Sequence, residues 1–364
     1  MVRSSEESAV TELFRATLQD DGVHSSRFLS RDVARGTKLR VRHGVYVDCG
    51  AWTQAPPWKR HRIAIAATAL RDPSLVFCRE TALLLHGLPL RRSPVKVMVR
   101  TAEPGWAGTK RPPHMDGRST GTPGGGSQQH MGESSAALRN IPTQHIEHAL
   151  PPGVGRHELR DVVRSSAYAP PHVLLPPSAI AEVRGPSGYQ AEPVELALVD
   201  AVSRMPFADA VVVLDAALGR SGLQLEEWLP YLTSARRRLR WRRAWEFADI
   251  RSESPGESLS RALMYELGFP VPALQQTVRT DEGDFRLDFC WKERGIIGEF
   301  DGRMKYFDDA LLAGEDSREV LYREKLREDA LRRAGWTVVR WGWAQLQRPE
   351  GLVRRLQKAG LETR

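Results

Sequence analysis

Residues 284–305, DFRLDFCWKERGIIGEFDGRMK, contain two short runs in which apolar and polar positions alternate. In the first run every second residue is apolar, which predicts a half-buried strand. The second run, IIGEFD, alternates in the same way, and the polar segment KERG between them suits a hairpin loop. The sequence therefore predicts a β-hairpin. Its first strand has an apolar face formed by Phe285, Leu287, Phe289 and Trp291, with Arg286, Asp288 and Cys290 on the opposite face.

The register of this hairpin brings carboxylates together. Pairing Trp291 with Ile296 places Asp288 directly opposite Glu299, with Cβ atoms about 5 Å apart. Asp301 shares a strand face with Glu299, so three like charges gather and require a counter-charge. Mg²⁺ is one solution, because it is held by one or two carboxylates together with waters and substrate phosphate oxygens. The alternative, equally weighted by the pairing alone, is an exposed edge neutralised by nearby cations. These are Arg286, Arg303 and Lys305.

Elements on both sides of the hairpin complete a predicted C-terminal domain. Ser254 and Pro255 suit the N-cap and first turn of a helix that ends at Gly268. Glu257 lies in its first turn, where it either leans toward the carboxylates or complements the helix dipole. A second helix is predicted over 319–334, followed by the strand WTVVRWGW. The apolar side predicted for that helix consists of Tyr322, Leu326, Ala330 and Ala334.

The N-terminal pattern predicts a winged helix-turn-helix. Apolar residues at helical spacing predict a helix over 6–20, a second helix follows in SRFLSRDVARG, and KLRVRHGVYVD predicts a pair of strands that turn at His43-Gly44. Aligned cations on the second helix and the wing suit contacts with DNA phosphates and guanine edges. The alternative is a solvated charged face on a protein–protein adaptor. The predicted DNA-binding residues are Arg27, Arg31 and Arg35 on the helix and Lys38, Arg40 and Arg42 on the wing.

The distribution of charge supports a nucleic-acid partner at the front of the chain. The net charge is +8 and the pI about 9.6. Residues 1–100 carry 17 Lys and Arg against 9 Asp and Glu, whereas the charges balance in 101–250 and in 251–364. Three scattered cysteines indicate neither a disulfide framework nor a zinc site. The first ten residues lack an apolar signal core and the longest apolar run is interrupted by aspartates, so we expect a cytoplasmic protein without a membrane partner.

The middle of the chain gives weaker signals. Residues 102–138 are rich in Gly, Ser, Gln and Pro, which predicts a flexible insertion. Two helices are predicted over 194–202 and 208–218, although VVVL in the second also suits a strand. In SARRRLRWRRAWEFADI, Arg236, Arg240 and Arg243 share a helical face. That face is either a second phosphate-contacting surface or the solvated side of a helix that packs through its tryptophans.

Several of these motifs resemble known families. Asp288, Glu299, a nearby Lys and Glu257 on the preceding helix resemble the PD-(D/E)xK nuclease superfamily. GESLSRALMYELGFP, LDFCW, GEFDGRMKY and EKLREDALRRAGWTVVRWGW are similar to small nuclease-like domains related to very-short-patch-repair endonucleases. GTKLRVRHGVY resembles the wing of AbiEi-type antitoxins, which often precede such domains. The chain departs from the superfamily pattern at position 301, where Asp301 stands in place of Lys.

Together, the residues and the resemblance predict a mixed α/β protein with a winged helix over 1–100, an insertion over 102–138, a mainly helical region over 139–250 and a restriction-endonuclease-like domain over 251–364. The predicted function is metal-dependent hydrolysis of DNA, with RNA also open as a substrate. The alternative is an antitoxin-like repressor with a degenerate nuclease fold. Mg²⁺ or Mn²⁺ is the expected cofactor, and duplex DNA, a cognate toxin and a second copy of the chain are the expected partners. The candidate catalytic residues are Glu257, Asp288, Glu299, Asp301 and Lys305, with Asp288 and Glu299 as the metal ligands.

Overall fold

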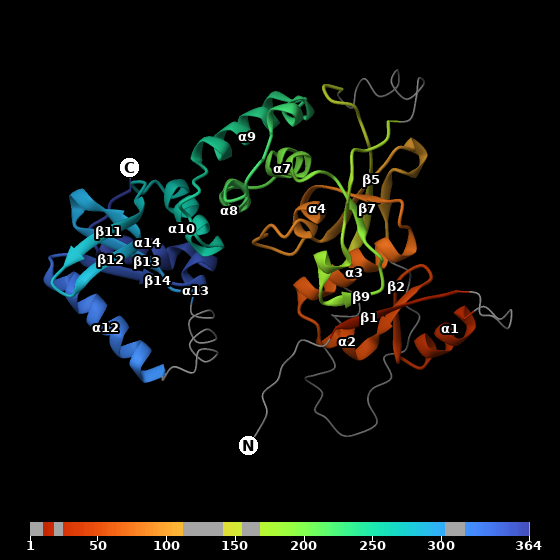
Figure 1. Ribbon diagram of the computed structural model, residues 1–364, viewed down its shortest axis with the longest axis horizontal. Coiled ribbons are helices and arrows are strands. Elements are labelled where there is room, and N and C mark those ends of the chain that lie inside the picture. The colour runs from red at the N-terminus through yellow and green to blue at the C-terminus, as the bar shows by residue number, and fades with distance from the viewer. Residues whose placement is uncertain (1–9, 18–24, 112–140, 155–167, 303–316, 364) are drawn as a thin grey trace. The chain divides into compact units, whose positions relative to one another are not determined.

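The computed structural model describes residues 10–17, 25–111, 141–154, 168–302 and 317–363 (Figure 1). The mixed α/β class predicted from the sequence is confirmed. The chain forms two compact units, one of residues 1–201 with 224–238 and the other of 202–223 with 239–364. None of the described helices is long and apolar enough to cross a bilayer.

The described residues of the first unit form two sheets. The four-stranded sheet has the order β2-β3-β1-β9, and its strands are β1 (Thr11–Arg15), β2 (Lys38–Arg42), β3 (Val45–Asp48) and β9 (Val183–Arg184). The six-stranded sheet has the order β6-β7-β5-β4-β10-β8. Its strands are β4 (Val76–Phe77), β5 (Lys96–Thr101), β6 (Gly108–Lys110), β7 (Thr143–His148), β8 (Val173–Leu175) and β10 (Tyr189–Ala191).

Helices connect and cover these sheets. α3 (Pro57–Arg71) is buried along most of its length because Ile63 to Ala69 are all inaccessible, which suits a helix enclosed on both sides. The other helical elements among the described residues of this unit are α1 (Ser26–Ala34), α2 (Cys49–Gln54), α4 (Arg79–Leu85), η1 (Pro104–Trp106), η3 (Pro177–Ile180), η4 (Glu226–Tyr231) and α7 (Val194–Val202), whose last residue belongs to the second unit. α9 (Ala235–Phe247) begins in this unit and ends in the other.

The helix predicted over residues 6–20 is wrong, because the described part of that range forms the strand β1. Leu13 pairs with Val47 and Phe14 with Tyr46 on β3, while Thr11 pairs with Val183 on β9. Thr11 and Leu13 are buried and Glu12 is exposed, so the segment also has the two-residue period of a strand. Pairing on both sides therefore outweighs the helical spacing. The helix and strand pair predicted after it are confirmed as α1, β2 and β3.

A cluster of buried charges joins distant segments of the first unit. Arg79 from α4, Arg100 from β5 and Arg237 from α9 contact Glu147 from β7, Glu192 and Asp200 from α7. The three carboxylate side chains are only 7, 2 and 5% exposed. Three positive and three negative charges balance each other, which is the condition for burying them.

The second unit is built on one sheet with the order β11-β12-β13-β14. β11 (Ala273–Thr280), β12 (Gly283–Trp291) and β13 (Ile296–Phe300) are antiparallel neighbours, and β14 (Thr337–Trp341) pairs in parallel with β13. The parallel connection passes through α12 (Ser317–Arg333). The remaining helical elements that the structure describes here are α8 (Phe207–Leu218), α10 (Pro255–Glu266), η5 (Lys292–Arg294), α13 (Trp343–Gln347) and α14 (Pro349–Lys358).

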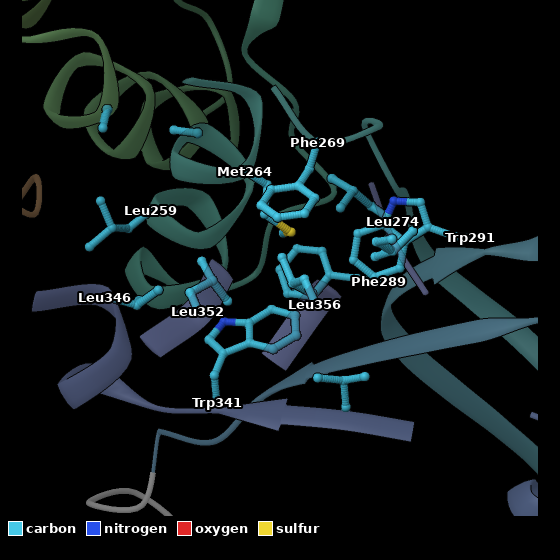
Figure 2. Close-up of a cluster of buried hydrophobic side chains, with 14 of the residues drawn as sticks. Leu259, Met264, Phe269, Leu274, Phe289, Trp291, Trp341, Leu346, Leu352 and Leu356 are labelled. Carbon is cyan, nitrogen blue, oxygen red and sulfur yellow. The ribbon is translucent and has the colours of Figure 1, made fainter. Parts of the chain in front are cut away.

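The helices α10, α13 and α14 enclose the larger core of this unit. Leu259 and Met264 from α10 and Leu352 and Leu356 from α14 pack against aromatic residues of the sheet (Figure 2). Both buried indoles in this core donate hydrogen bonds, Trp341 to Ser260 Oγ at 2.8 Å and Trp291 to Pro270 O at 2.8 Å. A smaller cluster of Leu287, Ile297 and Leu331 is formed around α12. The sheet is thus covered by two separate apolar groups.

Two close approaches fix α10 and the sheet in this packing. A Cβ at Gly256 would lie 2.0 Å from the ring of Phe300, and a Cβ at Gly298 would lie 2.5 Å from the ring of Trp341. Only glycine leaves room for these aromatic rings. Phe300 is thereby held against the first turn of α10, next to Glu257.

Two predicted domain boundaries and one predicted helix face need correction. Residues 104–110 of the predicted insertion form η1 and β6, and β6 pairs with β7; residues 112–140 lie outside the described residues. Residues 139–250 do not form one mainly helical region, because they contribute β7 to β10 to the first unit and α8 to the second. In α12 the predicted apolar side is wrong, since Tyr322 is 58% and Leu326 39% exposed, Ala334 is also exposed, and Ala330 and Leu331 are buried.

Candidate functional site

Glu257 is fixed by the start of α10. Ser254 caps this helix by accepting a hydrogen bond from Glu257 N at 3.2 Å, with Pro255 in the first turn, as predicted. The Glu257 carboxylate receives three hydrogen bonds, from Ser254 Oγ at 2.7 Å, Glu253 N at 3.0 Å and Gln275 Nε2 at 2.9 Å. One turn later, Arg261 forms a buried ion pair with Asp215 of α8 at 2.9 Å. This carboxylate is therefore held in one orientation on an anchored helix.

The hairpin turn has the predicted register. Trp291 pairs with Ile296 and Phe289 with Gly298, and Gly295 ends the loop with a φ of 64°. The described ladder stops there, one pair before Asp288 and Glu299. The pairing with β11 has the same gap, because it runs from Ala273↔Cys290 to Thr280↔Gly283 and omits only Gln275 and Asp288. Asp288 thus stands where both ladders are interrupted.

The alternation of β12 reverses at the same position. Phe285 and Leu287 belong to the cluster around α12, whereas Phe289 and Trp291 belong to the larger core. The sequence predicted all four on one face, so this part of the prediction is wrong. A strand alternates strictly only where its ladder is regular, and here it is not. The Asp288 side chain accepts a hydrogen bond from the backbone N–H of Phe300 at 2.9 Å.

Asp288 has a strongly shifted pKa. Burial, followed by the negative charge of Glu257, raises the pKa of Asp288 to about 7 from 3.8, although the Phe300 N–H and Arg327 act in the opposite direction. The influence of Glu257 exceeds that of Glu299. Burial likewise raises the pKa of Glu257, against its hydrogen bonds from Ser254 and Gln275. These two neighbouring carboxylates share no described cation between them.

Glu299, by contrast, is neutralised within the protein. Arg327 of α12 donates to Glu299 Oε1 at 2.6 Å, and Arg340 of β14 lies 3.1 Å from Glu299 Oε2. Arg340 is also the residue paired with Glu299 across the parallel strands. Burial raises the pKa of Glu299, with both arginines opposing that shift.

The counter-charges that the sequence proposed are placed differently. Arg286 pairs with Glu253 and not with Glu299. Asp301 directly follows β13, and its backbone N–H donates to Trp341 O at 2.7 Å. Arg303 and Lys305 lie outside the described residues. The two guanidiniums on Glu299 were missed by sequence reasoning, and the strand WTVVRWGW, with an arginine in its centre, was the signal that could have revealed one of them.

A divalent cation fits part of this donor set. Asp288 and Glu257 offer hard carboxylate oxygens, and one or two such ligands with waters and phosphate oxygens suffice for Mg²⁺. Asp288 Oδ2 accepts the Phe300 N–H, and among the described residues no donor contacts Oδ1. Both Glu299 oxygens are engaged by arginine, and the described residues contain no group of three or more His, Cys, Asp or Glu arranged for a metal. The fit thus rests on Asp288 and Glu257, with Glu299 available only after it releases a guanidinium.

The predicted DNA-binding residues form a smaller surface than expected. Arg27 and Arg31 are exposed on α1 and Arg35 at its C-cap, while Lys38 and Arg40 are partly exposed on β2. Arg42 is 3% exposed, with Nε donating to Thr68 Oγ1 at 2.9 Å, so its assignment to DNA is wrong. An irregularity between Arg40 and Arg42 in the pairing with β3 turns the side chain inward.

α9 carries a second group of arginines. Six of its thirteen residues are Arg and one is Glu. Arg236, Arg240 and Arg242 are exposed, and no carboxylate of the described residues pairs with them. Arg243 is instead packed over the Phe207 ring at 4.3 Å, and Trp241 stacks on Trp245. The helix therefore packs through its tryptophan side, as one predicted interpretation held, and also exposes unneutralised positive charge.

Part of the chain is similar to known mycobacterial proteins. No protein-family model matches the chain. The chain is similar to two uncharacterized proteins of Mycobacterium tuberculosis, one from strain CDC 1551 / Oshkosh and one from strain ATCC 25618 / H37Rv, each 34% identical over 94 residues. The match covers 26% of this chain and spans about a third, 31%, of the length of each relative.

Proposed function

We propose that the second unit is a metal-dependent nuclease-like domain and that the first unit binds duplex DNA. The observation that carries this proposal is the position of Asp288, outside both strand ladders and beside the firmly held Glu257. The element order α10, β11, β12, β13, α12, β14 also agrees with the restriction-endonuclease-like core that the sequence motifs resemble. One fold hosts many unrelated functions, so the proposal depends mainly on the site itself.

In this proposal Asp288 is the principal metal ligand and Glu257 the second, and Glu299 is a further ligand. Mg²⁺ or Mn²⁺ bound there would polarise the scissile phosphate and lower the pKa of an attacking water. Glu257, held in one orientation by three donors, is suited to bind the ion beside Asp288. Glu299 must give up a contact with Arg327 or Arg340 before an oxygen is available. These arginines also bring positive charge to the cluster, which would stabilise the charge that develops on the phosphate in the transition state.

Metal-dependent cleavage is the direct test of the enzymatic half. We expect the full-length chain to nick or cut plasmid DNA in Mg²⁺ or Mn²⁺ and to lose this activity when EDTA removes the metal. RNA of the same sequence, assayed in parallel, establishes which backbone is the substrate. The absence of cleavage of either polymer under all metal conditions would contradict the enzymatic proposal.

A non-catalytic regulator is the second candidate. The two guanidiniums on Glu299 favour it, because a carboxylate that is already neutralised needs no metal. Asp301, which stands where the superfamily pattern has Lys, points the same way. In this case the chain would be an antitoxin-like repressor with a cognate toxin as partner, and a palindromic operator would call for a dimer. Tight duplex binding without cleavage is the expected result.

Both candidates require DNA contacts from α1. Replacing Arg27, Arg31 and Arg35 by Ala is expected to reduce the slope of log K against log salt by about 2 to 3, since each phosphate contact contributes about 0.9. Fluorescence anisotropy with a labelled duplex at several salt concentrations measures this slope. The matched variant with Lys at all three positions keeps the charge, so it should retain most of the wild-type slope. An unchanged slope in the Ala variant would show that α1 does not contact the DNA phosphates, and the exposed arginines of α9 would be the next residues to replace.

A further inference from the structure

Gln275 lies opposite the candidate catalytic aspartate and has an unusual backbone. It has a φ of 52°, the left-handed region, although it lies inside the strand β11. A residue with a Cβ rarely adopts this conformation, because the Cβ then lies too close to the backbone. By count it is the partner of Asp288, and this is the only pair missing between its paired neighbours. The strain therefore sits at the point where the sheet becomes irregular.

The irregularity has two consequences for the site. The apolar residues of β12 change from one cluster to the other across Asp288, as they would if the strand were turned at that residue. Asp288 also leaves both ladders, and its side chain instead receives the Phe300 N–H. Backbone irregularities of this kind are common beside active sites, where they re-aim a side chain.

Both polar atoms of the Gln275 side-chain amide form hydrogen bonds. Its Nε2 donates to Glu257 Oε2 at 2.9 Å, and its Oε1 accepts from Arg286 Nε at 2.7 Å. Arg286 is paired with Glu253, whose backbone N–H donates to the same Glu257 oxygen at 3.0 Å. The contacts form a closed ring in which an amide donor, not a cation, holds Glu257. A cation in this place would neutralise the carboxylate, whereas the neutral amide leaves its charge available.

We propose that Gln275 is a positioning residue of the carboxylate site, which turns the strand at Asp288 through its left-handed backbone and holds Glu257 beside Asp288 through its side-chain amide. This inference rests on the proposed function for its link to metal binding. The placement of Glu257 by the amide stands independently of that function. Gln275 acts through Glu257 and Asp288 and does not itself act on substrate.

Three variants of the full-length chain test the contribution of the Gln275 amide. Gln275→Gly accepts the left-handed backbone without a Cβ and removes the amide, so the fold is retained while Glu257 loses a donor. Gln275→Ala removes the amide and keeps the Cβ. Gln276→Ala is the matched control, because the neighbouring glutamine is exposed and its amide contacts only the backbone oxygen of Leu274 among the described residues.

The first measurement is the titration of the Glu257 carboxyl by ¹³C NMR. A hydrogen bond donated to a carboxylate favours its charged form, so removing the Gln275 amide is expected to raise the pKa of Glu257 in both Gln275 variants. Gln276→Ala should titrate as the wild type does. A Glu257 titration that is the same in all four proteins would overturn the inference.

The second measurement is Mn²⁺ affinity by calorimetry. Loss of a residue that orients a ligand lowers metal affinity by about 10- to 100-fold, and we expect Gln275→Gly to bind Mn²⁺ at least about 10-fold more weakly than the wild type. Equal affinity in the variant and the wild type, with an unshifted Glu257, would contradict a positioning role. Should the wild type itself bind no Mn²⁺, the metal chemistry of the proposed function fails, and the Glu257 titration alone then decides the role of Gln275.

Discussion

Asp288→Asn is expected to make the protein more stable at pH 8 and to abolish metal-dependent cleavage. In the native state the Asp288 carboxylate is ionised at this pH only against burial and the charge of Glu257, which together raise its pKa from 3.8 to about 7. A difference of three pKa units corresponds to roughly 4 kcal/mol, and partial exposure reduces the expected gain to about 2 to 3 kcal/mol. Asn keeps the acceptor for the Phe300 N–H and carries no charge.

The sign of this effect depends on pH in a defined way. A raised pKa means that the folded protein holds the Asp288 proton more tightly than the unfolded chain does. The contribution of Asp288 to the free energy of unfolding is therefore complete below about pH 4 and is lost as the pH rises to about 7. The stability difference between Asp288→Asn and wild type should therefore be small at pH 4 and reach a plateau above pH 7. Urea unfolding in EDTA, followed by tryptophan fluorescence, measures it.

Asp284→Asn is the matched control for this experiment. Asp284 lies on the same strand, but its side chain is 56% exposed. Its ion pair with Arg279 is long, at 3.7 Å, and exposed. Removing the Asp284 charge should therefore change the free energy of unfolding by less than about 1 kcal/mol at any pH. Cleavage should persist in the control. A loss of stability in Asp288→Asn at pH 8 would contradict the charge repulsion inferred at the site.

Asp200→Asn is expected to cause the largest loss of stability in the first unit. The Asp200 carboxylate is 5% exposed and contacts Arg79 at 2.8 Å, Arg237 at 2.5 Å and also Arg100. Neutralising it leaves three buried guanidiniums against two carboxylates. Removing one partner of a buried ion pair typically lowers the free energy of unfolding by about 3 to 5 kcal/mol, because the remaining charge is uncompensated.

Urea unfolding monitored by circular dichroism measures this loss. Glu226→Gln is the control, since Glu226 is exposed in the same unit and no ion pair of the described residues involves it. A change below about 1 kcal/mol in Asp200→Asn would mean that water or rearranged carboxylates replace the lost contact. The cluster would then not be what fastens the start of α9 to the first unit.

The sequence predicted the local elements of the site well and its long-range partners poorly. The hairpin and its register follow from the alternation and the length of the loop, and the capped start of α10 follows from Ser254 and Pro255, so both could be predicted. The cations on Glu299 could not, because Arg327 lies 28 residues later and reaches it only after α12 folds back on the sheet. Gln275 gave no signal, since glutamine has no special preference for the left-handed backbone it adopts.

The errors at the N-terminus have a similar origin. The apolar residues in 11–15 fit both a helical and a strand period. The segment forms a strand because β3 and β9, from other parts of the sequence, pair with it on both sides. Arg42 belongs to an alternating basic series, yet the irregularity after Arg40 buries it. Patterns of period two identify a strand, but they fix the direction of a side chain only where the strand is regular.

The central claim is that Asp288 anchors a divalent-cation site, and calorimetric titration of Mn²⁺ into the full-length protein tests it most directly. The titration is made with and without a short DNA duplex, because Mg²⁺ and Mn²⁺ sites are often completed by substrate phosphate. We predict binding by the wild type and by Asp284→Asn, tighter with the duplex present, and none by Asp288→Asn. Equal Mn²⁺ binding by wild type and Asp288→Asn, or no binding by the wild type even with duplex, would contradict the claim.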